Sequence, residues 1–403
     1  MPLMVHKYGG TSVGSVDRIK AVAERIARVH RAGDRIVAVV SAMGDTTDDL
    51  LKLASAINPH PEQRELDQLL ATGEEQAMAL VAMALHAIGV PAVSLTGPQA
   101  GIRTTGPYGR AKIADIAPAR IHESLDAGQV VIVAGFQGLN EEDDVTTLGR
   151  GGSDTTAVAL AAALKADRCV IYTDVDGIFT ADPRVVPNAR KLDLISYDDM
   201  LELAWRGAKM QPRSIEIAKM YGVPVEVASS FADKPGTLIA EVEDLENRQA
   251  ISGIAYDRGV AKITVANVPA GTDSIATVFG ALADADISVD VIVVEGAFGP
   301  DKSGISFTVN EKDLAAAVPI VGKAVESLGG TIRHAVGYGK VSVVGTGMFN
   351  RPGYAARMFR TLAALGVAVD MVTTSEIQVT CVIPRDDVDR SVRGLHDAFG
   401  LAG

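Results

Sequence analysis

Short runs of apolar, mostly β-branched residues alternate with helical stretches through the first part of the chain. The runs cover residues 36–40, 92–95, 130–134 and 169–173 and are bounded mostly by Gly, Asp or Ser. Between them, Asp17–Arg31 gathers its apolar residues on one helical face, and Asp154–Lys165 is almost wholly apolar after its first turn. Apolar runs that alternate with helices indicate buried parallel strands. The pattern predicts one large α/β sandwich over residues 1–230.

The amino-acid composition of the sequence changes after Ser230. Residues 233–246 contain Pro-Gly and then a run of acidic residues, so we expect a linker over 231–250. Beyond it, Lys262–Val265 returns in similar form at Lys340–Val343, and Asp290 has a counterpart in Asp370. Each unit follows a β-α-β-β-α order, which predicts two ferredoxin-like units over 251–335 and 336–403.

Composition and charge limit the partners that we expect. The 403 residues include 38 Lys+Arg against 50 Asp+Glu, a formal net charge of -12, which argues against nucleic acid and anionic membranes. The longest uncharged window, residues 76–102, is divided by Gly and Pro into a helix and a strand and does not predict a membrane span. Cys169 and Cys381 lie far apart in apolar runs, and no export signal is visible. We therefore expect a cytoplasmic protein.

The first predicted strand ends in Lys7-Tyr8-Gly9-Gly10. Two glycines allow backbone N–H groups to approach an anion closely, and the lysine adds a positive charge, so the motif is a candidate phosphate site. An ordinary strand-to-helix turn with a solvated lysine is the alternative. No P-loop and no complete dinucleotide-binding fingerprint occur in the sequence.

A second glycine-rich element, residues 149–156, leads directly into the apolar helix. Ser153, Asp154 or Thr155 is expected to cap that helix, and Arg150 with nearby backbone donors forms a candidate carboxylate pocket. A well-capped buried helix is the alternative.

Three further segments carry candidate polar residues. Residues 41–48 follow a predicted strand, and Thr72-Gly73-Glu74 is expected to open a helix at Glu75. The segment 172–184 is either a solvated loop or a nucleotide site in which Tyr172 and Phe179 line an adenine slot.

In order and spacing, residues 7–12, 41–48, 149–156 and 172–177 resemble the motifs of the monofunctional aspartokinases, and the resemblance covers essentially the whole chain. It implies an amino-acid-kinase (carbamate-kinase-like) α/β sandwich followed by two ACT units. The implied reaction is transfer of the ATP γ-phosphate to the β-carboxylate of L-aspartate, giving 4-phospho-L-aspartate, the first step towards lysine, threonine, methionine and diaminopimelate. A carboxylate is already ionised at neutral pH, so catalysis needs charge stabilisation rather than a general base.

The resemblance also implies a role for each matching position. The expected catalytic pair is Lys7, which would neutralise charge on the phosphoryl group, and Asp154, which would orient Lys7. Glu74 would hold the α-ammonium of aspartate and Arg150 its α-carboxylate. The expected substrate contacts are Ser41, Thr47, Glu74, Arg150, Gly151, Gly152 and Ser153. The expected ATP contacts are Lys7, Tyr8, Gly9, Gly10, Ser153, Thr173, Asp174, Phe179, Asp182, Arg184 and Lys209. Mg²⁺ would bridge the ATP phosphates with few protein ligands, and no residue is assigned as a metal ligand.

The ACT units would bind lysine or threonine as inhibitors. The expected effector contacts are Ser288, Val289, Asp290, Ala355, Ala356, Val369, Asp370, Glu376 and Ile377. The second unit keeps the family loop at 350–353, whereas the first has residues 269–273 in place of Asp-x-Pro-Gly, and Val294 where Gln is frequent. These differences predict altered feedback, with threonine the effector most affected. We also expect a homo-oligomer formed through the ACT units, with or without a short ACT-only subunit.

Two other readings of the sequence remain. A sister kinase of the same fold would act on glutamate, N-acetylglutamate, carbamate or UMP, but the segment 41–48 and the doubled ACT region disfavour it. A non-catalytic amino-acid sensor would keep the ACT units beside an inactive kinase domain. Lys7, Glu74, Arg150 and Asp154 are all present, which argues against an inactive domain.

Overall fold

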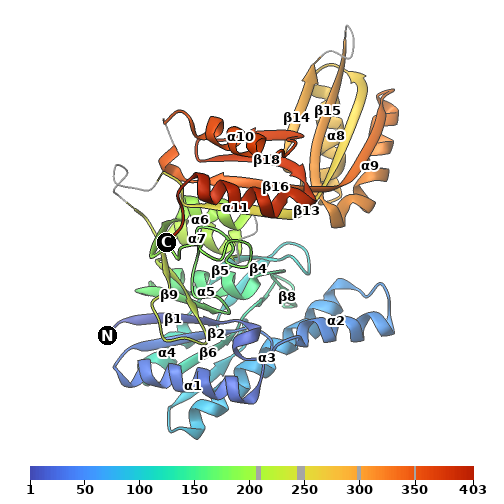
Figure 1. The fold of residues 1–403 in the computed structure, drawn as a ribbon. Coiled ribbons are helices and arrows are strands. Elements are labelled where there is room, and N and C mark those ends of the chain that lie inside the picture. The colour runs from blue at the N-terminus through green and yellow to red at the C-terminus, as the bar shows by residue number, and fades with distance from the viewer. Residues whose placement is uncertain (206–209, 243–249, 297–300, 349–350) are drawn as a thin grey trace. The chain divides into compact units, whose positions relative to one another are not determined.

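A computed structural model describes residues 1–205, 210–242, 250–296, 301–348 and 351–403 (Figure 1). The described chain forms two compact units. The first contains residues 1–178, 191–205 and 210–242, and the second contains 179–190 and the described residues from 250 to the C-terminus. The mixed α/β class expected from the sequence is confirmed.

The first unit is built on a sheet whose described strands follow the order β10-β12-β11-β9-β1-β2-β6-β3. Every neighbouring pair is parallel except β11 and β12. The four strands expected from the apolar runs are present as β2, β3, β6 and β9. The bounds are β1 (Leu3–Tyr8), β2 (Arg35–Val40), β3 (Ala92–Leu95), β6 (Val130–Ala134), β9 (Arg168–Thr173), β10 (Leu194–Ser196), β11 (Val225–Ser229) and β12 (Thr237–Ala240). Strand β12 lies within the range expected to be a linker.

Helices cover both faces of this sheet (Figure 1). On one face, α1 (Val16–Arg31) and α3 (Gln63–Ala87) contribute buried residues such as Ile26 and Leu85, which join Ile36 and Ile132 of the strands in one core. Helix α5 (Gly152–Ala163) packs on the other face, against β1, β2 and β9. The remaining helices of the unit are η1 (Gly10–Ser12), α2 (Thr46–Ile57), α4 (Ala119–Asp126), α6 (Tyr197–Trp205) and α7 (Pro212–Tyr221).

A smaller sheet of the same unit follows the order β5-β4-β7-β8. Its strands are β4 (Ile102–Thr105), β5 (Lys112–Ile116), β7 (Gln137–Leu139) and β8 (Val145–Thr147). Strand β8 packs against α3 and continues directly into the glycine-rich loop that precedes α5. The small sheet therefore carries that loop.

The expectation that Thr72-Gly73-Glu74 opens a helix was wrong. These residues lie in the interior of α3, which begins nine residues before Thr72, at Gln63. A Cβ atom at Gly73 would lie 2.9 Å from the Cβ of Ala42, so the glycine permits close packing of the helix against the turn after β2. Tertiary packing, not helix capping, explains a glycine in this position.

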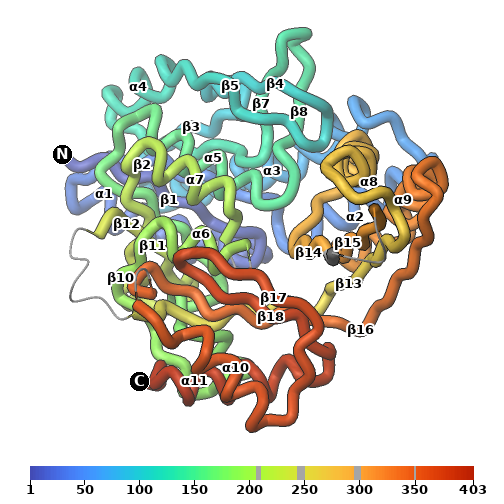
Figure 2. Tube along the Cα trace, turned by 90° about the horizontal axis from the view of Figure 1, so that it is seen from above, coloured from blue at the N-terminus to red at the C-terminus, as the bar shows by residue number. Residues whose placement is uncertain are grey.

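The second unit contains two repeats that share one sheet, with described strands in the order β14-β15-β13-β16-β18-β17 (Figures 1 and 2). Helices α8 and α9 belong to the first repeat, and α10 and α11 to the second. The strands are β13 (Gly253–Pro269), β14 (Ile292–Gly296), β15 (Lys302–Asn310), β16 (Thr331–Val344), β17 (Met371–Thr374) and β18 (Gln378–Pro384). The helices are α8 (Thr272–Asp284), η2 (Glu311–Asp313), α9 (Leu314–Ser327), η3 (Thr346–Met348), α10 (Tyr354–Ala364), η4 (Arg385–Asp387) and α11 (Val388–Ala398).

The long strands β13 and β16 pass through both repeats. Residues 253–257 pair with 340–344 in the second repeat, whereas 260–266 pair with 331–338 in the first. Ile251 and Ile254 consequently belong to the core of the second repeat, which also contains Val388. The two repeats are thus not consecutive along the chain, in contrast to the ranges 251–335 and 336–403 expected from the internal similarity.

Residues 179–190 belong to the second unit, although their neighbours on both sides in the sequence belong to the first. Val185 and Val186 join the core of the second repeat, which also contains Leu401. The hydroxyl of Thr180 lies 3.0 Å from Nε2 of His396. This segment was expected within the 1–230 sandwich, and a sequence pattern cannot reveal such an exchange because the contacts are distant in the chain.

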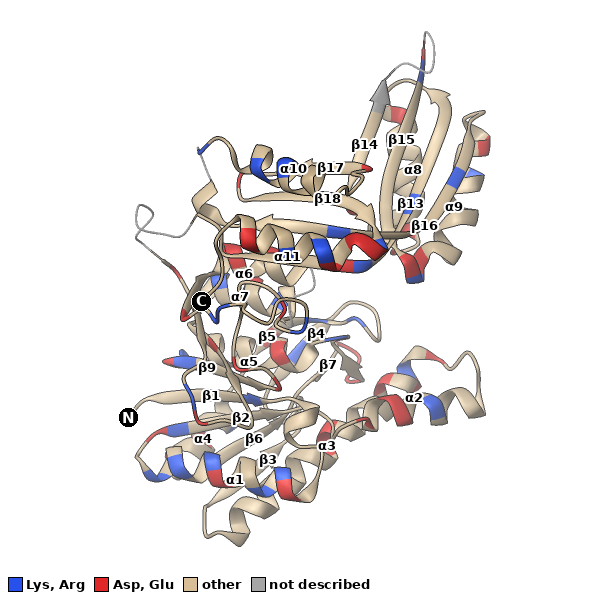
Figure 3. Ribbon diagram, viewed as in Figure 1, with Lys and Arg blue, Asp and Glu red and all other residues tan. Residues whose placement is uncertain are grey.

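Charges of both signs are interleaved on the exposed helices α1, α2 and α11 (Figure 3). None of the described helices has the length and apolar character needed to cross a membrane.

Substitution of Gly73 by Ala tests the close approach of α3. At an open helical position this change stabilises a protein by about 0.5–1 kcal/mol, but here the added methyl group collides with Ala42. We expect Gly73→Ala to lower the melting temperature by at least ~2 °C. Gly280→Ala in α8, where a Cβ atom meets nothing within 4 Å, is the matched control and should not lower it. Equal melting temperatures for the two variants would contradict the packing argument.

Candidate functional site

The candidate site lies at the edge of the large sheet where five parallel strands end. Tyr8 of β1 pairs with Val40 of β2 and Tyr172 of β9, and the row continues to Ala134 of β6 and Ala228 of β11. The residues that follow these positions must therefore emerge side by side. In open α/β sheets, this carboxyl edge is where ligands bind.

Lys7 and Asp154 form the central ion pair of the edge. Nζ of Lys7, near the end of β1, lies 2.7 Å from Oδ1 of Asp154, in the first turn of α5. Both side chains are mostly buried, with 12% and 14% of their surfaces exposed, but neither is sealed from the site. The contact is a close ion pair without ideal hydrogen-bond alignment. A phosphate oxygen could therefore share the ammonium group.

Gly9 and Gly10, which follow β1, are each required by close packing, but against different neighbours. A Cβ atom at Gly9 would lie 3.3 Å from Nζ of Lys7, so the glycine leaves room for the ammonium group. A Cβ atom at Gly10 would lie 2.8 Å from the carbonyl oxygen of Ala42, so this glycine allows the turns after β1 and β2 to touch. The N–H of Gly9 is directed at the carbonyl of Tyr172, at a long 3.4 Å.

The side chain of Tyr8 is buried and directed away from this edge. Its ring stacks on Tyr172 with centroids 4.9 Å apart, and Arg25 covers Tyr172 at 4.6 Å. Its hydroxyl lies 3.3 Å from Nδ1 of His6, whose pKa burial lowers to about 4. Tyr8 can thus reach a ligand only through its backbone. The suggestion that Tyr172 lines an adenine slot is not supported, because its ring packs between Tyr8 and Arg25.

Glu74 reaches the edge from α3. Its side chain is buried, and Oε1 accepts a hydrogen bond from the backbone N–H of Ala42 at 3.1 Å. Oε2 is buried and has no hydrogen-bond partner. Burial raises the pKa of Glu74 to about 7, partly opposed by the Ala42 hydrogen bond. A cationic ligand would restore the ordinary carboxylate state.

The loop from Gly149 to Gly152 presents Arg150, which is exposed. Gly149 and Gly151 have positive φ angles of 76° and 67°, a conformation that L side chains rarely adopt. The carbonyl oxygen of Arg150 accepts a hydrogen bond of 2.7 Å from Nε2 of Gln211. The backbone of the arginine is therefore held while its side chain remains available.

The expected N-cap of α5 was wrong. Gly151, in a left-handed conformation, occupies the N-cap position, and no side chain caps the helix. The hydroxyl of Thr155 instead donates to the carbonyl of Gly151, and that of Thr156 donates to the carbonyl of Gly152. The polar residues at this helix start are thus not needed as caps.

Of the other expected substrate contacts, three occupy positions around the same edge. Ser41 directly follows β2, and Thr47 lies in the first turn of α2. Ser153 is buried in the first turn of α5, and a Cβ atom at Gly135 would lie 2.7 Å from its hydroxyl oxygen. Gly135 therefore makes room for Ser153 beside the end of β6.

The expected ATP contacts are divided between the two units. Thr173 ends β9, and its hydroxyl donates to the adjacent Asp174 at 3.2 Å. Phe179, Asp182 and Arg184 belong to the second unit. There, Arg184 donates to both carboxylate oxygens of Asp182, and Arg184 holds the pKa of that carboxyl at about 2. Lys209 lies outside the described residues.

The expected effector residues lie in both repeats of the second unit, and two aspartates among them form ion pairs across the repeats. Nζ of Lys262, in the first repeat, lies 2.7 Å from Asp370 in the second. Lys340, in the second repeat, pairs with Asp290 in the first. The other positions are partly or fully exposed, namely Ser288, Val289, Ala355, Ala356, Val369, Glu376 and Ile377. A surface cavity of about 670 Å³ next to Ala355 and Ala356 is lined by Pro352, Gly353, Tyr354, Arg357, Arg360, Thr361 and Ala364.

Sequence reasoning missed the residues that support the edge through tertiary contacts. Gln211 holds the backbone of Arg150, and the hydroxyl of Ser230 contacts that of Ser12 beside the first glycine loop. Arg25 donates to the carbonyl oxygens of Ser229 and Ser230. Gln211, Arg25 and Ser230 belong to no motif, so no signal in one sequence marks them.

Family comparisons agree with this geometry. Residues 2–229 match the amino acid kinase family, and residues 341–399 match an ACT domain. The first match covers the strand edge with Lys7, Glu74, Arg150 and Asp154.

Individual proteins resemble the chain over its whole length. The aspartokinase of Mycolicibacterium smegmatis is 49% identical over 409 residues, which span 100% of this chain and 97% of the relative. The solved structure of E. coli aspartokinase III with aspartate and ADP is 26% identical, has a TM-score of 0.83 and covers 98% of this chain and 99% of that chain. Its complex with lysine and aspartate is also 26% identical, with a TM-score of 0.75 and the same coverage. The chain therefore belongs to the aspartokinase family.

Proposed function

We propose that this protein transfers the γ-phosphoryl group of ATP to the side-chain carboxylate of L-aspartate. The observation that most directly supports this reaction is the buried, unpartnered Oε2 of Glu74. It lies at the edge that also holds the Lys7–Asp154 ion pair. A buried acceptor without a donor is costly, and the ammonium group of an amino acid would supply the missing donor. The nearby lysine suits the phosphoryl group.

The mechanism follows from charge and alignment. Lys7 neutralises the charge that develops on the transferred phosphoryl group, and Asp154 keeps Lys7 in place. Glu74 and Arg150 hold the two α-substituents of aspartate, with Ser41, Thr47 and Ser153 as further contacts. The side-chain carboxylate then faces the phosphate as an ionised nucleophile, for which no base is needed.

The substrate on the nucleotide side is MgATP, with Mg²⁺ carried by the phosphate oxygens. Among the described residues, no group of three or more His, Cys, Asp or Glu could hold a metal ion. We assign backbone groups of Tyr8, Gly9 and Gly10, together with Thr173 and Asp174, to the nucleotide. The family resemblance also assigns Phe179, Asp182, Arg184 and Lys209 to the nucleotide.

The proposal extends to regulation and assembly. Lysine or threonine acts as a feedback inhibitor at the effector residues of the two repeats. The edge strand β14 exposes Ile292 and Val294, with 48% and 51% of their surfaces accessible, which favours pairing with a second copy of this chain. A short ACT-only chain would use the same edges. The cytoplasm is the expected compartment, since Cys169 and Cys381 are free thiols.

ATP-dependent formation of an acyl hydroxamate tests the reaction directly. We expect product with L-aspartate and not with L-glutamate, and we expect Lys7→Met to lower kcat by roughly 10²-fold or more. Lys20→Met, an exposed lysine on α1, is the control and should retain activity. Product with glutamate alone would favour the sister-kinase reading. An absence of product from a folded wild-type protein would favour the sensor.

The raised pKa of Glu74 predicts how aspartate binding depends on pH. Below pH 7 the free protein carries a protonated Glu74, which cannot pair with the ammonium group. The KM for aspartate should therefore rise roughly tenfold between pH 8 and pH 6. Glu74→Gln should have a high KM that is nearly constant over this range. A constant KM in the wild-type protein would contradict the role of Glu74.

Inhibition titrations test the effector assignment. The first repeat presents Val294 where the family frequently has Gln, so a polar effector loses a hydrogen-bonding partner there. We expect lysine to inhibit and threonine alone to inhibit at least about tenfold less strongly. Val294→Gln should strengthen inhibition by threonine without changing kcat. Full sensitivity of the wild-type protein to threonine would contradict this assignment.

A further inference from the structure

Asp67 is a fully buried carboxylate on α3 that belongs to none of the motifs. Oδ2 accepts hydrogen bonds of 2.8 Å from the backbone N–H groups of Gly109 and Thr147, and Oδ1 accepts one of 2.8 Å from the hydroxyl of Thr147. Its exposed fraction is 0%. A buried carboxylate is tolerated only where donors satisfy it, so this arrangement ties α3 firmly to its neighbours.

The three donor groups belong to two residues, Gly109 and Thr147, and both residues support the Arg150 loop. Thr147 is the last residue of β8 and lies three positions before Arg150. Gly109 belongs to the turn on which the loop rests, because a Cβ atom at Gly149 would lie 3.1 Å from the carbonyl oxygen of Gly109. One carboxylate thus holds both the strand that enters the loop and the turn beneath it.

Asp67 shares one face of α3 with Glu74. The residues 64, 67, 71 and 74 recur at helical spacing, and each makes a contact away from its own helix. Asp67 and the carbonyl of Ala71 contact the small sheet, and Arg64 contacts the loop just before β8. Glu74 instead contacts the turn after β2. A helix rises about 1.5 Å per residue, so Asp67 and Glu74 stand roughly 10 Å apart along one rigid element.

We propose that Asp67 is a positioning residue for the aspartate site, acting through the loop of Arg150. It holds that loop in register with Glu74, so that the groups for the α-carboxylate and the α-ammonium keep a fixed separation. The inference rests on the proposed function, in which Arg150 and Glu74 hold these two groups. Asp67 itself does not touch the substrate.

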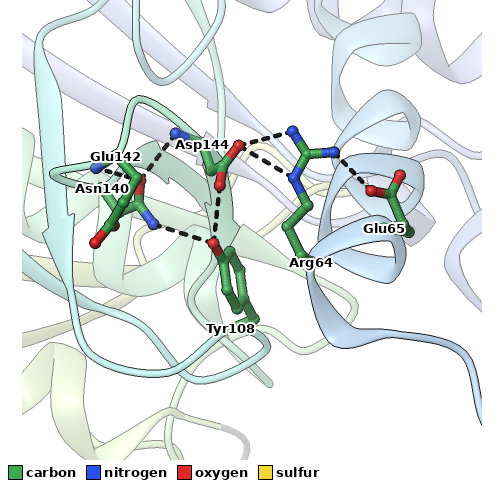
Figure 4. Close-up of polar contacts among 6 residues, drawn as sticks. All are labelled: Arg64, Glu65, Tyr108, Asn140, Glu142 and Asp144. Atoms are coloured by element: carbon green, nitrogen blue, oxygen red, sulfur yellow. Dashed lines mark hydrogen bonds and ion pairs between the residues drawn. The ribbon is translucent and has the colours of Figure 1, made fainter.

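Arg64, which Figure 4 shows with its partners, offers a matched control on α3. Its guanidinium donates to Oδ1 of Asp144 at 2.7 Å and 3.1 Å, while the hydroxyl of Tyr108 donates to Oδ2 of Asp144 at 2.9 Å. This cluster also ties α3 to the small sheet, but it is more exposed. Its contacts are made by Tyr108 and Asp144, which adjoin Gly109 and β8, and it makes no hydrogen bond to Gly109 or Thr147. A general loss of packing would appear in Arg64 variants, whereas a specific effect on the loop would not.

Steady-state kinetics with Asp67→Ala, Asp67→Asn and Arg64→Gln test the proposal. We expect Asp67→Ala to raise the KM for aspartate roughly tenfold or more, while the KM for MgATP changes less than about twofold. Asp67→Asn should recover most of the loss, because an amide of the same shape can still accept the two N–H groups. Arg64→Gln should change neither KM. Equal changes in both KM values for Asp67→Ala, or no change in either, would overturn the proposal.

Combination with Arg150→Ala separates this inference from the proposed function. If Asp67 acts through Arg150, Asp67→Ala should raise the KM for aspartate no further in an Arg150→Ala background. The same rise in both backgrounds would overturn the positioning role alone. An Arg150→Ala protein with an unchanged KM would instead overturn the assignment of Arg150, whatever Asp67 does.

Thr147→Val covers the case in which Asp67→Ala fails to fold. It removes one hydroxyl group and leaves the backbone hydrogen bond to Asp67 intact. We expect a rise of roughly threefold in the KM for aspartate, again with little change for MgATP. A folded Thr147→Val protein with the wild-type KM for aspartate would contradict the proposal.

Discussion

Parallel pairing of β9, β1, β2 and β6 is the constraint on which the candidate site depends. It aligns the ends of these strands in one row, so the residues that follow them emerge at a single edge. Lys7 is near the end of β1, and α5 begins where its first turn can bring Asp154 within 2.7 Å. Without this alignment, the glycine loops would be separate turns with no common chemistry.

Helix α3 supplies a second fixed reference beside the strand edge. Gly73 lets the helix approach the turn after β2, and this approach brings the carboxylate of Glu74 to the N–H of Ala42. The resulting burial raises the pKa of Glu74 and leaves one oxygen unpartnered. Such a group destabilises the unliganded protein at neutral pH, a cost typical of residues retained for binding.

The second unit is organised around shared strands rather than around two separate domains. Residues of β13 and β16 pair in both repeats, and Lys262 and Lys340 form ion pairs with Asp370 and Asp290 of the opposite repeat. A substitution at either aspartate would therefore remove an ion pair between the repeats. Residues 179–190 also join the core of the second repeat, so the chain segment with Asp182 and Arg184 is anchored there.

The sequence by itself determined the class of fold, the principal strands, the doubled C-terminal unit and the motifs at the candidate site. These features depend on local periodicity and on glycine-rich turns, which are visible within a short window. Tertiary structure alone decided that Gly73 lies inside a helix, that 179–190 belongs to the second unit, and that Asp67 supports the Arg150 loop. Each of these depends on contacts between residues far apart in the chain. The hydrophobic pattern describes only local periodicity, so it does not indicate which distant residues make contact.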